Sequence, residues 1–428
     1  MDKLEQAGFP TYLVGGCVRD AYLGLTPHDF DITTAALPEQ TEAVFSDCRL
    51  VTAGKKHGTI GVVTDCGVVE ITTFRTEGDY ADSRHPQWVK FVADIESDLA
   101  RRDFTVNAMA WSPSRGFADP FGGREDLDSH ILRAVGDPVA RFEEDALRIL
   151  RGIRFAARFD LKPEAGTKAA MVSLAPTLER IARERVFEEL SRFLLQAGVH
   201  DLLTFAPILA AAIPELQPTL GFDQRSPHHA YDVFTHIAHV TAAVPPILPL
   251  RWAALLHDVG KPASFTTDET GRGHFYGHAK VSAEMADEIL RTLKAPTALR
   301  EEVVSLISLH MAKLEPDRKL LRRRFSRLGA ETVKSLLLLQ ESDMGSKGTG
   351  NAQEMEQFSE IRRLIAEIED ENACLSLKDL AVKGNDLMAL GLTGRKIGET
   401  LSFLLEQVVD ETLPNDRATL LSAAKNHT

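Results

Sequence analysis

The sequence predicts an α+β fold, in which a small mixed sheet with helices is followed by a long region built from helices alone. Two observations predict it. Up to about residue 135, short apolar runs at residues 12–14, 60–63 and 68–73 indicate strands, with helical patterns between them. Farther along, apolar residues recur at helical spacing, as in residues 141–159 and 178–195. Strands followed by runs of helices are typical of an α+β fold.

Composition and charge narrow the class of protein. The 428 residues are 44% hydrophobic and 26% charged, as in an ordinary globular protein of about two to four domains. No apolar run is long enough to span a membrane, and the first residues lack the apolar core of a signal peptide. The four cysteines have no metal or disulfide spacing, so we expect a cytoplasmic protein without membrane association. The net charge of −13 means that any RNA partner must bind to local basic patches.

The first stretch with a chemical pattern is residues 12–31, YLVGGCVRDAYLGLTPHDFDI. It predicts a buried strand, a turn at Gly15 and Gly16, a helix, and a second strand that carries Asp29 and Asp31. Two glycines let the backbone approach a ligand closely, and the start of the helix suits a phosphate. Residues two apart on a strand point to the same side, so the two aspartates form a carboxylate pair. Such a pair beside a phosphate site predicts Mg²⁺ for phosphoryl or nucleotidyl transfer, although each part alone is also common in ordinary turns and strand ends.

Three more stretches add charged candidates to this site. Glu70 lies on the strand predicted at residues 68–73 and becomes a third carboxylate if the two strands are neighbours. Residues 75–89 are polar and non-periodic, which predicts a mobile loop. Arg101 and Arg102 precede a predicted helix start and are able to neutralise a triphosphate, or they are a solvated basic pair.

Residues 141–159 predict one amphipathic helix with a charged face that carries Asp145, Arg148, Arg151 and Arg154. A plain surface helix would also explain the pattern. The chemical alternative is base selection: an Asp accepts a hydrogen bond from the exocyclic amine of C or A, and an Arg donates to the ring nitrogen beside it. U and G present an oxygen where the Asp needs a donor. Two such bonds, at roughly 1.5–3 kcal/mol each, give discrimination of about a thousandfold without a nucleic-acid template.

Together these motifs resemble the tRNA nucleotidyltransferase and poly(A) polymerase family, within the polymerase-β-like nucleotidyltransferases. The matching segments are GGxVRD, DFD, RRDFTxNAM and EDxxRxxR. The resemblance implies a head domain of that fold and the addition of C, C and A to the 3′ end of tRNA from CTP and ATP. It also implies two Mg²⁺ ions on Asp29 and Asp31 with help from Glu70, and base selection by Asp145 and Arg148. The implied nucleotide ligands are Gly15, Gly16, Arg19, Arg102, Asp103, Asn107, Arg151 and Arg154.

Histidines cluster in the next part of the chain. The string LRWAALLHDVGKP puts His257 and Asp258 side by side at the end of a buried helix, a pair that suits a divalent transition metal. Each of the other candidates lies on a separate predicted helix, and a lone histidine there is usually a core residue. The pattern resembles the HD phosphohydrolase superfamily, which implies a metal site made by His236, His257, Asp258, His278, His310 and Asp343. Family members often carry an Asp after the last of these histidines, where this chain has Met311.

The expected domains are a head at residues 1–135, a neck at 136–225, an HD metal-binding domain at 226–345, and a helical tRNA-binding body and tail at 346–428. The helix at residues 178–195 resembles the neck helix of the family and is expected to support the helix that carries Asp145 and Arg148; its arginines offer a phosphate-facing edge as the alternative. The basic run at residues 313–327 is either a solvated face or a phosphate contact.

Two alternative functions remain open from sequence. One is a poly(A) polymerase or an enzyme that adds only the final A. The other is an HD metallophosphohydrolase whose head only binds RNA. The oligomeric state, the metal and substrate of the HD site, and the roles of Arg101 against Arg102 are not determined by the sequence.

Overall fold

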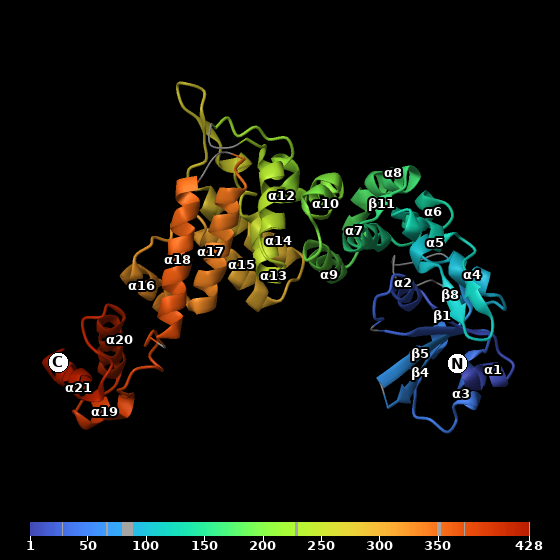
Figure 1. Ribbon diagram of the computed structural model, residues 1–428, viewed down its shortest axis with the longest axis horizontal. Coiled ribbons are helices and arrows are strands. Elements are labelled where there is room, and N and C mark those ends of the chain that lie inside the picture. The colour runs from blue at the N-terminus through green and yellow to red at the C-terminus, as the bar shows by residue number, and fades with distance from the viewer. Residues whose placement is uncertain are drawn as a thin grey trace. The chain divides into compact units, whose positions relative to one another are not determined.

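The computed structural model describes residues 1–27, 29–65, 67–78, 89–226, 230–348, 352–371 and 373–427. The chain forms two compact units, Met1–Gln217 and Pro218–Thr428. Figure 1 shows the sheet in the first unit (blue) and mainly helices in the second (yellow to red). The predicted α+β fold class is therefore confirmed. The four expected domains remain a prediction, because the contacts divide the chain only once.

The sheet of the first unit has, among the described residues, seven strands in the order β3-β4-β5-β2-β1-β8-β9. β1 (Thr11–Val14) runs antiparallel to β2 (Asp31–Thr34), which runs parallel to β5 (Gly67–Thr73), so the sheet is mixed as expected. The strands predicted at residues 60–63 and 68–73 are confirmed. The remaining strands are β3 (Leu50–Val51), β4 (Thr59–Thr64), β8 (Ala110–Ser112) and β9 (Gly116–Ala118).

The two faces of this sheet have different neighbours. Ile32 and Ile71 belong to a buried cluster with Leu4, on the side of α1 (Asp2–Gln6) and α3 (Pro38–Val44). Val14 belongs to a second cluster with Leu99 of α4 (Ile95–Ala100). Because side chains alternate along a strand, Asp31, which is paired with Val14, faces away from the cluster of Ile32. Figure 1 shows α2 (Gly16–Tyr22) on the opposite side of the strands from α1 and α3.

Helices complete the first unit. The single helix expected over residues 141–159 is wrong: it is two helices, separated at Asp145, whose backbone is extended at φ −147° and ψ 104°. The Asp145 carboxylate accepts a hydrogen bond from the Leu147 N–H at 2.9 Å and so caps the second helix, a role that Asp prefers to a helix interior. The helices are α5 (Gly123–Asp128), α6 (Pro138–Glu144), α7 (Leu147–Phe159), α8 (Ala165–Leu174), α9 (Arg183–Leu194), α10 (Val199–Thr204) and α11 (Ala206–Ala212).

Three further expectations about local structure are corrected. Residues 175–180 are a 3₁₀ helix before α9, so the helix expected from residue 178 begins only at Arg183. Arg101 and Arg102 follow α4 and precede a short 3₁₀ helix, Thr105–Asn107, and not an α-helix. The loop expected at residues 75–89 starts and ends in a hairpin of β6 (Arg75–Glu77) and β7 (Val89–Phe91), and its residues 79–88 lie outside the described residues.

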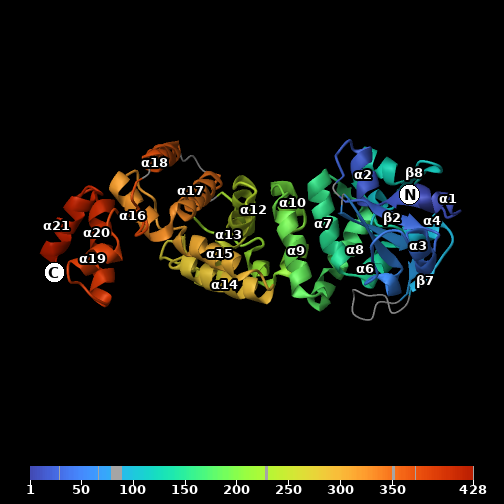
Figure 2. The same cartoon turned by 90° about the horizontal axis from the view of Figure 1, so that it is seen from below.

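The second unit packs its first helices around a common core. Figures 1 and 2 show α13, α14 and α15 side by side, with α12 against α13. A short hairpin of β12 (Thr266–Thr267) and β13 (Gly273–His274) connects α13 to α14. The helices of this core are α12 (Val233–Ala243), α13 (Leu248–Leu256), α14 (His278–Thr292), α15 (Thr297–Leu309) and α17 (Ala330–Gly345).

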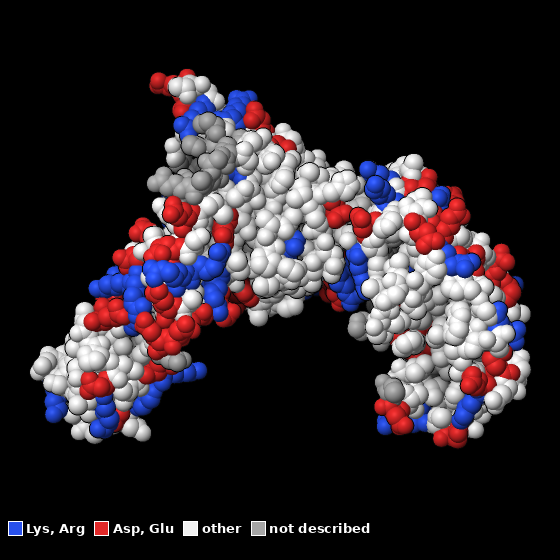
Figure 3. Space-filling view, in the orientation of Figure 1, with Lys and Arg blue, Asp and Glu red and all other residues white. Residues whose placement is uncertain are grey.

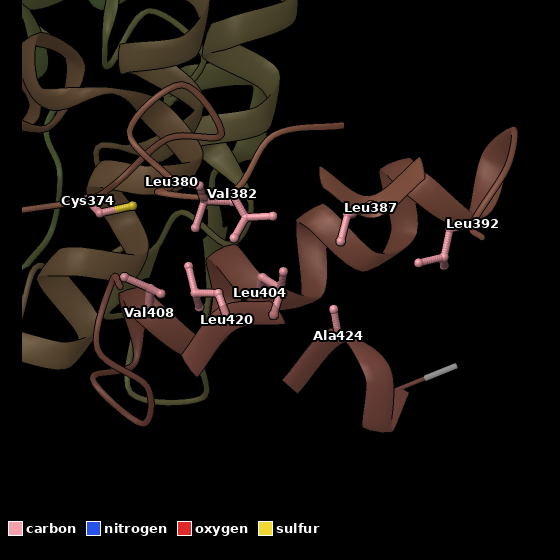
Figure 4. Packing of buried hydrophobic residues seen from close by; sticks show 9 residues of the cluster. All are labelled: Cys374, Leu380, Val382, Leu387, Leu392, Leu404, Val408, Leu420 and Ala424. Carbon is pink, nitrogen blue, oxygen red and sulfur yellow. The ribbon is translucent and has the colours of Figure 1, made fainter. Parts of the chain in front are cut away.

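The C-terminal end has a small hydrophobic core of its own. Figure 4 shows Leu380 and Val382 beside Leu404 and Leu420 in this cluster, which is fully or nearly fully buried. The helices here are α16 (Arg318–Leu328), α18 (Ala352–Asp370), α19 (Gly384–Ala389), α20 (Arg395–Val409) and α21 (Arg417–His427). Within the described residues, none of the helices combines the length and apolar character that crossing a bilayer requires.

Candidate functional sites

A cavity of about 560 Å³ in the first unit brings together most of the predicted nucleotide-site residues. We call it the arginine cavity. Its lining includes Gly15, Gly16, Arg19, Asp29, Asp31, Arg102, Asp103, Asn107, Asp145, Arg148, Arg151 and Arg154. Glu70 is the one predicted residue of this site that does not line it.

The glycine turn has a steric reason. Gly15 has φ +73°, and a Cβ atom at this position would lie 2.6 Å from Nη1 of Arg102. Any other residue would therefore displace the Arg102 guanidinium and strain the backbone. Close behind, Arg19 is only 4% exposed and donates to Asp20 at 2.6 and 2.9 Å, and to the Asn107 side chain. The lack of a side chain at Gly15 thus leaves room for the Arg102 guanidinium. Asp20 and Asn107 hold the Arg19 guanidinium in place.

The carboxylates sit at the edge of the sheet. Asp31 opens β2 and pairs in register with Glu70 on the parallel strand β5, so these two side chains share a face. Asp29 precedes the strand, so the expectation that both aspartates lie on β2 is wrong. Asp29, Asp31 and Glu70 are exposed, and in the described part of the chain they do not converge within 4.8 Å. Among the described residues, no partner forms a hydrogen bond or ion pair with the side chain of Asp29 or Asp31, whereas the backbone of Asp31 pairs within the sheet.

Eight arginines line the arginine cavity, and six acidic residues hold them. The excess of cations over their acidic partners favours an anionic ligand with several charges. The ion pairs are Arg19 and Arg158 with Asp20, Arg101 and Arg102 with Asp98, Arg148 with Glu144, Arg151 with Asp103, Arg154 with Glu189, and Arg185 with Asp145.

Arg101 and Arg102 differ in how firmly Asp98 holds them. Arg101 donates to Asp98 Oδ1 through Nε at 3.1 Å and Nη2 at 3.0 Å, whereas Arg102 stays 3.8 Å from the other carboxylate oxygen. The Nε of Arg102 has no hydrogen-bond partner among the described atoms, and burial lowers the pKa of its guanidinium. Arg102 is therefore the more available of the two for a phosphate. Sequence reasoning missed Asp98, although its position three residues before Arg101 is a recognisable pairing distance.

Asp145 and Arg148 lie on the same wall of the cavity, and both have partners. The Asp145 carboxylate accepts from Nη2 of Arg185 at 3.3 Å, besides capping α7. Arg148 pairs with Glu144 and donates to the Arg141 and Arg101 carbonyls at 3.1 and 3.3 Å. Sequence reasoning placed Arg185 on a supporting helix, with a phosphate-facing edge as the alternative, and did not predict its contact with Asp145.

The last two arginines of α7 are tied more tightly. Arg151 donates to Asp103 at 2.6 and 2.7 Å. Burial alone would raise the pKa of Asp103, but Arg151 and the Asn107 amide lower it to about 2. Arg154 and Glu189, at 2.6 Å, are both more than nine-tenths buried and join α7 to α9. These contacts give Arg151 and Arg154 a structural role.

Five residues of the predicted metal site form two groups of potential ligands that share Asp258: His236, His257 and Asp258, and Asp258, His278 and His310, with the ligand atoms of each group within 4.8 Å of one another. The sixth, Asp343, lies beside His236. We call these six residues the histidine cluster. Nδ1 of His257, His278 and His310 faces the carbonyl oxygens of Ala254, Phe275 and Ile307 at 2.8, 2.8 and 2.6 Å, and Nδ1 of His236 faces that of Ser346 at 3.3 Å.

This arrangement fixes the tautomer of each ring that is neutral. A carbonyl oxygen only accepts, so each Nδ1 carries a proton, and a neutral ring then keeps its lone pair on Nε2. Burial opposes the charged form of His257, but the Asp258 carboxylate raises its pKa. Burial lowers the pKa of His310 to about 4, so that this ring is neutral at neutral pH. Nε2 of His236 lies 3.4 Å from that of His257, and Nε2 of His278 lies 3.3 Å from that of His310. Facing lone pairs repel each other unless a cation lies between them.

Two carboxylates complete the cluster. Asp343 lies 3.0 Å from His236 Nε2, and Asp258 lies 3.3 Å from His278 Nε2. Burial alone would raise the pKa of Asp258, but His257 and Lys261 lower it well below the usual range. The donor set of imidazole nitrogens and carboxylate oxygens therefore fits a divalent transition metal. Met311 is 56% exposed beside it, and His228 and His229 lie outside the described residues.

The basic run at residues 313–327 is largely neutralised within the second unit. Arg318 pairs with Glu371 and Glu411, Arg323 pairs with Asp410 at 2.6 Å, and Arg322 donates to the Val408 and Val409 carbonyls. Figure 3 shows Lys and Arg side chains interleaved with Asp and Glu side chains over α16 and α18. Much of this run therefore fastens α16 to the neighbouring helices.

Comparison with known proteins adds independent information. Residues 11–133 match the family described as Poly A polymerase head domain. Residues 160–220 match a probable RNA- and SrmB-binding site of polymerase A, and residues 264–424 match a putative tRNA nucleotidyltransferase domain 2.

Two similar proteins and one similar solved structure are all CCA-adding enzymes. The CCA-adding enzyme of Streptococcus gordonii is 35% identical over 97% of this chain and 93% of its own length. The CCA-adding enzyme of Streptococcus suis is 46% identical, but that similarity covers 51% of this chain and 56% of the relative. The crystal structure of the Bacillus stearothermophilus CCA-adding enzyme in complex with CTP, 27% identical, covers all of this chain and 95% of its own, with a TM-score of 0.72. The chain therefore belongs to the family of CCA-adding enzymes and is a nucleotidyltransferase.

Proposed function

We propose that this protein adds C, C and A in turn to the 3′ end of tRNA, using CTP and ATP. The observation that carries the proposal is that Asp145 and Arg148 line the same cavity as Asp29 and Asp31. A nucleotide whose base contacts Asp145 and Arg148 would thus place its triphosphate near Asp29 and Asp31. The names of the relatives, and the CTP in the Bacillus stearothermophilus complex, support the same substrate class.

In this proposal the triphosphate binds beside the glycine turn. Arg102 supplies a guanidinium that lies 3.8 Å from Asp98. Arg19, which pairs with Asp20, also lines the cavity. The exposed carboxylates of Asp29 and Asp31 would bind Mg²⁺, with Glu70 adding charge from the next strand. Mg²⁺ held there would lower the pKa of the attacking 3′-hydroxyl and stabilise the leaving pyrophosphate.

Base selection requires Asp145 and Arg148 to change partners. Asp145 would exchange the Arg185 guanidinium for the exocyclic amine of C or A, and Arg148 would turn from Glu144 towards the ring nitrogen. UTP and GTP would leave the Asp145 carboxylate facing an oxygen. The exchange keeps a charge-assisted hydrogen bond on each side chain only when the correct base is bound, which is the basis of discrimination.

The direct test is incorporation into tRNA that lacks its 3′ end, with CTP alone, ATP alone and both. We expect C from CTP alone, the complete end from both, and no addition from ATP alone. Addition of A without any C would overturn the proposal in favour of a poly(A) polymerase or an enzyme that adds only A.

A second activity is favoured by the histidine cluster: hydrolysis of 3′-terminal phosphoesters. In this reaction water adds to phosphorus, the bond from phosphorus to the ribose oxygen breaks, and the ribose oxygen takes up a proton. The four Nε2 atoms support it, because together with the two carboxylates they form a donor set that suits a divalent cation. RNA ending in a 3′-phosphate or a 2′,3′-cyclic phosphate is the test substrate. Failure of the metal-loaded protein to open or remove either group would remove this second activity.

A further inference from the structure

A cavity of about 250 Å³ adjoins the histidine cluster. Asp258, His278, His310 and Asp343 line it. The rest of its lining includes cations and an aromatic ring that are not among the predicted metal ligands. We call this space the cluster cavity.

The cations in this lining, Lys261, Arg272 and Lys347, are suited to bind a phosphate. Lys261 is 4% exposed, and its Nζ lies 2.7 Å from Asp258 Oδ2 and 2.8 Å from the Gln224 side-chain oxygen. Arg272 and Lys347 also line the cavity, and their side chains form no ion pair with any described residue. Two cations without an ion pair, in a cavity that is also lined by potential metal ligands, favour an anionic ligand.

Tyr276 adds a flat apolar surface at the edge of the cavity. It is 77% exposed, and its ring stacks on His274 with 5.3 Å between ring centroids and 7° between planes. His274 is in turn held by Asp268 at 2.8 Å. The yellow hairpin of Figure 1 that carries these residues projects beyond the helices of its unit. An aromatic ring that is supported on one face and open on the other is suited to stack with a base.

The size of the cavity limits what enters it. Sites that enclose a whole small-molecule ligand usually measure roughly 300–1,000 Å³, and the cluster cavity is smaller, at about 250 Å³. A phosphate with part of its sugar fits inside, while a base must stay at the rim. Tyr276 lies at that rim.

We propose that the cluster cavity binds a terminal nucleoside phosphate, with the phosphate between the histidine cluster and Arg272 and Lys347, and the base stacked on Tyr276. The proposal deepens the hydrolytic activity proposed above and rests on it. Lys261 acts as a positioning residue that orients Asp258. The same chemistry is offered by a free nucleoside monophosphate and by the 3′ end of an RNA.

Equilibrium binding tests this without any chemical step. The probe is a 2-aminopurine riboside with a phosphonate in place of the 3′-phosphate, whose P–C bond is not hydrolysed; stacking quenches its fluorescence. We expect Tyr276→Ala to raise the Kd about tenfold to a hundredfold and to reduce the quenching, and Tyr276→Phe to behave as wild type. Arg272→Ala should raise the Kd about tenfold, and Lys280→Ala, a charge-matched change on α14 outside the cavity, should not.

Two comparisons separate the possible outcomes. A short RNA ending in the same group that binds more tightly than the mononucleotide identifies an RNA end as the ligand, and the reverse order identifies a free nucleotide. Equal affinity of wild type and Tyr276→Ala for both probes would overturn the proposal. If binding depends on Tyr276 but no phosphoester is cleaved, the hydrolytic activity fails and the subsite stands. Any binding of the probe to the arginine cavity is the same in all these variants, so it does not change the comparison between them.

Discussion

The arginine cavity and the histidine cluster gather different kinds of side chain. In the first, eight guanidinium groups share six acidic partners, and one of them, Arg102, is held only at 3.8 Å. In the second, four imidazole lone pairs and two carboxylates converge, with Nε2 atoms as close as 3.3 Å. In the first site guanidinium groups outnumber the acidic side chains that pair with them, and in the second site potential metal ligands converge.

This difference shows that the kind of side chain gathered at each site indicates its class of ligand. A polyanion such as a nucleoside triphosphate would complete the arginine cavity, and a divalent cation would complete the histidine cluster. The two sites lie in separate compact units, so we expect them to respond independently to substitution.

The largest effect should come from paired substitutions that break one site and spare the other. Asp31→Asn removes a charge proposed to bind Mg²⁺ and should lower nucleotide incorporation by more than about a thousandfold. Asp258→Asn should leave incorporation unchanged and abolish metal retention by the histidine cluster. Incorporation into truncated tRNA and metal analysis of each variant give both results. Loss of incorporation in the Asp258 variant would contradict the independence of the sites.

The buried pair behind the arginine cavity should respond next. Glu189→Gln leaves the Arg154 guanidinium buried without a negative partner, and should lower the free energy of unfolding by about 3–5 kcal/mol. Replacing both residues by Met and Leu should restore most of it, since no charge remains buried. Chemical denaturation measures both. A Glu189→Gln protein as stable as wild type would show that Arg154 has another partner.

Removal of metal should sharpen the comparison. At a metal concentration about a hundred times the Kd, binding stabilises the folded state by about 2.7 kcal/mol, and a chelator should remove that stabilisation. Thermal unfolding with and without chelator measures it. The Asp258→Asn protein is the control and should not respond. A chelator effect that persists in this variant would place the metal outside the histidine cluster.

A smaller effect is expected on base choice. Asp145→Asn gives the side chain a donor, which suits the carbonyl oxygen of U, so discrimination against UTP should fall about tenfold to a hundredfold. Arg185→Ala removes the present partner of Asp145 without changing its chemistry, and should keep the preference for C and A. Competition between CTP and UTP measures both. Unchanged selectivity in the Asp145 variant would remove this residue from base recognition.

The sequence was enough to predict which residues meet, but less informative about how they are held. The GGxVRD and DFD segments and the arginines of residues 148–154 do line one cavity, because strand pairing and helical spacing are local patterns. Asp145 was expected within a helix. Its side chain instead caps the following helix. Helical periodicity does not show whether an Asp lies inside a helix or caps one.

The partners that come from distant parts of the chain could not be predicted. Glu189, which holds Arg154, and Arg185, which holds Asp145, lie 35 and 40 residues from the groups they contact. The orientation of each histidine ring depends on a backbone carbonyl, which no side-chain pattern encodes. Tyr276 follows strands of only two residues, too short to show a period of alternation.

The most direct test of the account is diffraction from crystals soaked with CTP and Mn²⁺, using the anomalous signal of the metal. The account predicts Mn²⁺ among the Nε2 atoms of the histidine cluster. It also predicts CTP in the arginine cavity, with its base edge on Asp145 and Arg148 and its triphosphate over Asp29 and Asp31. A histidine cluster without metal, or a base bound away from Asp145 while that carboxylate still contacts Arg185, would contradict it.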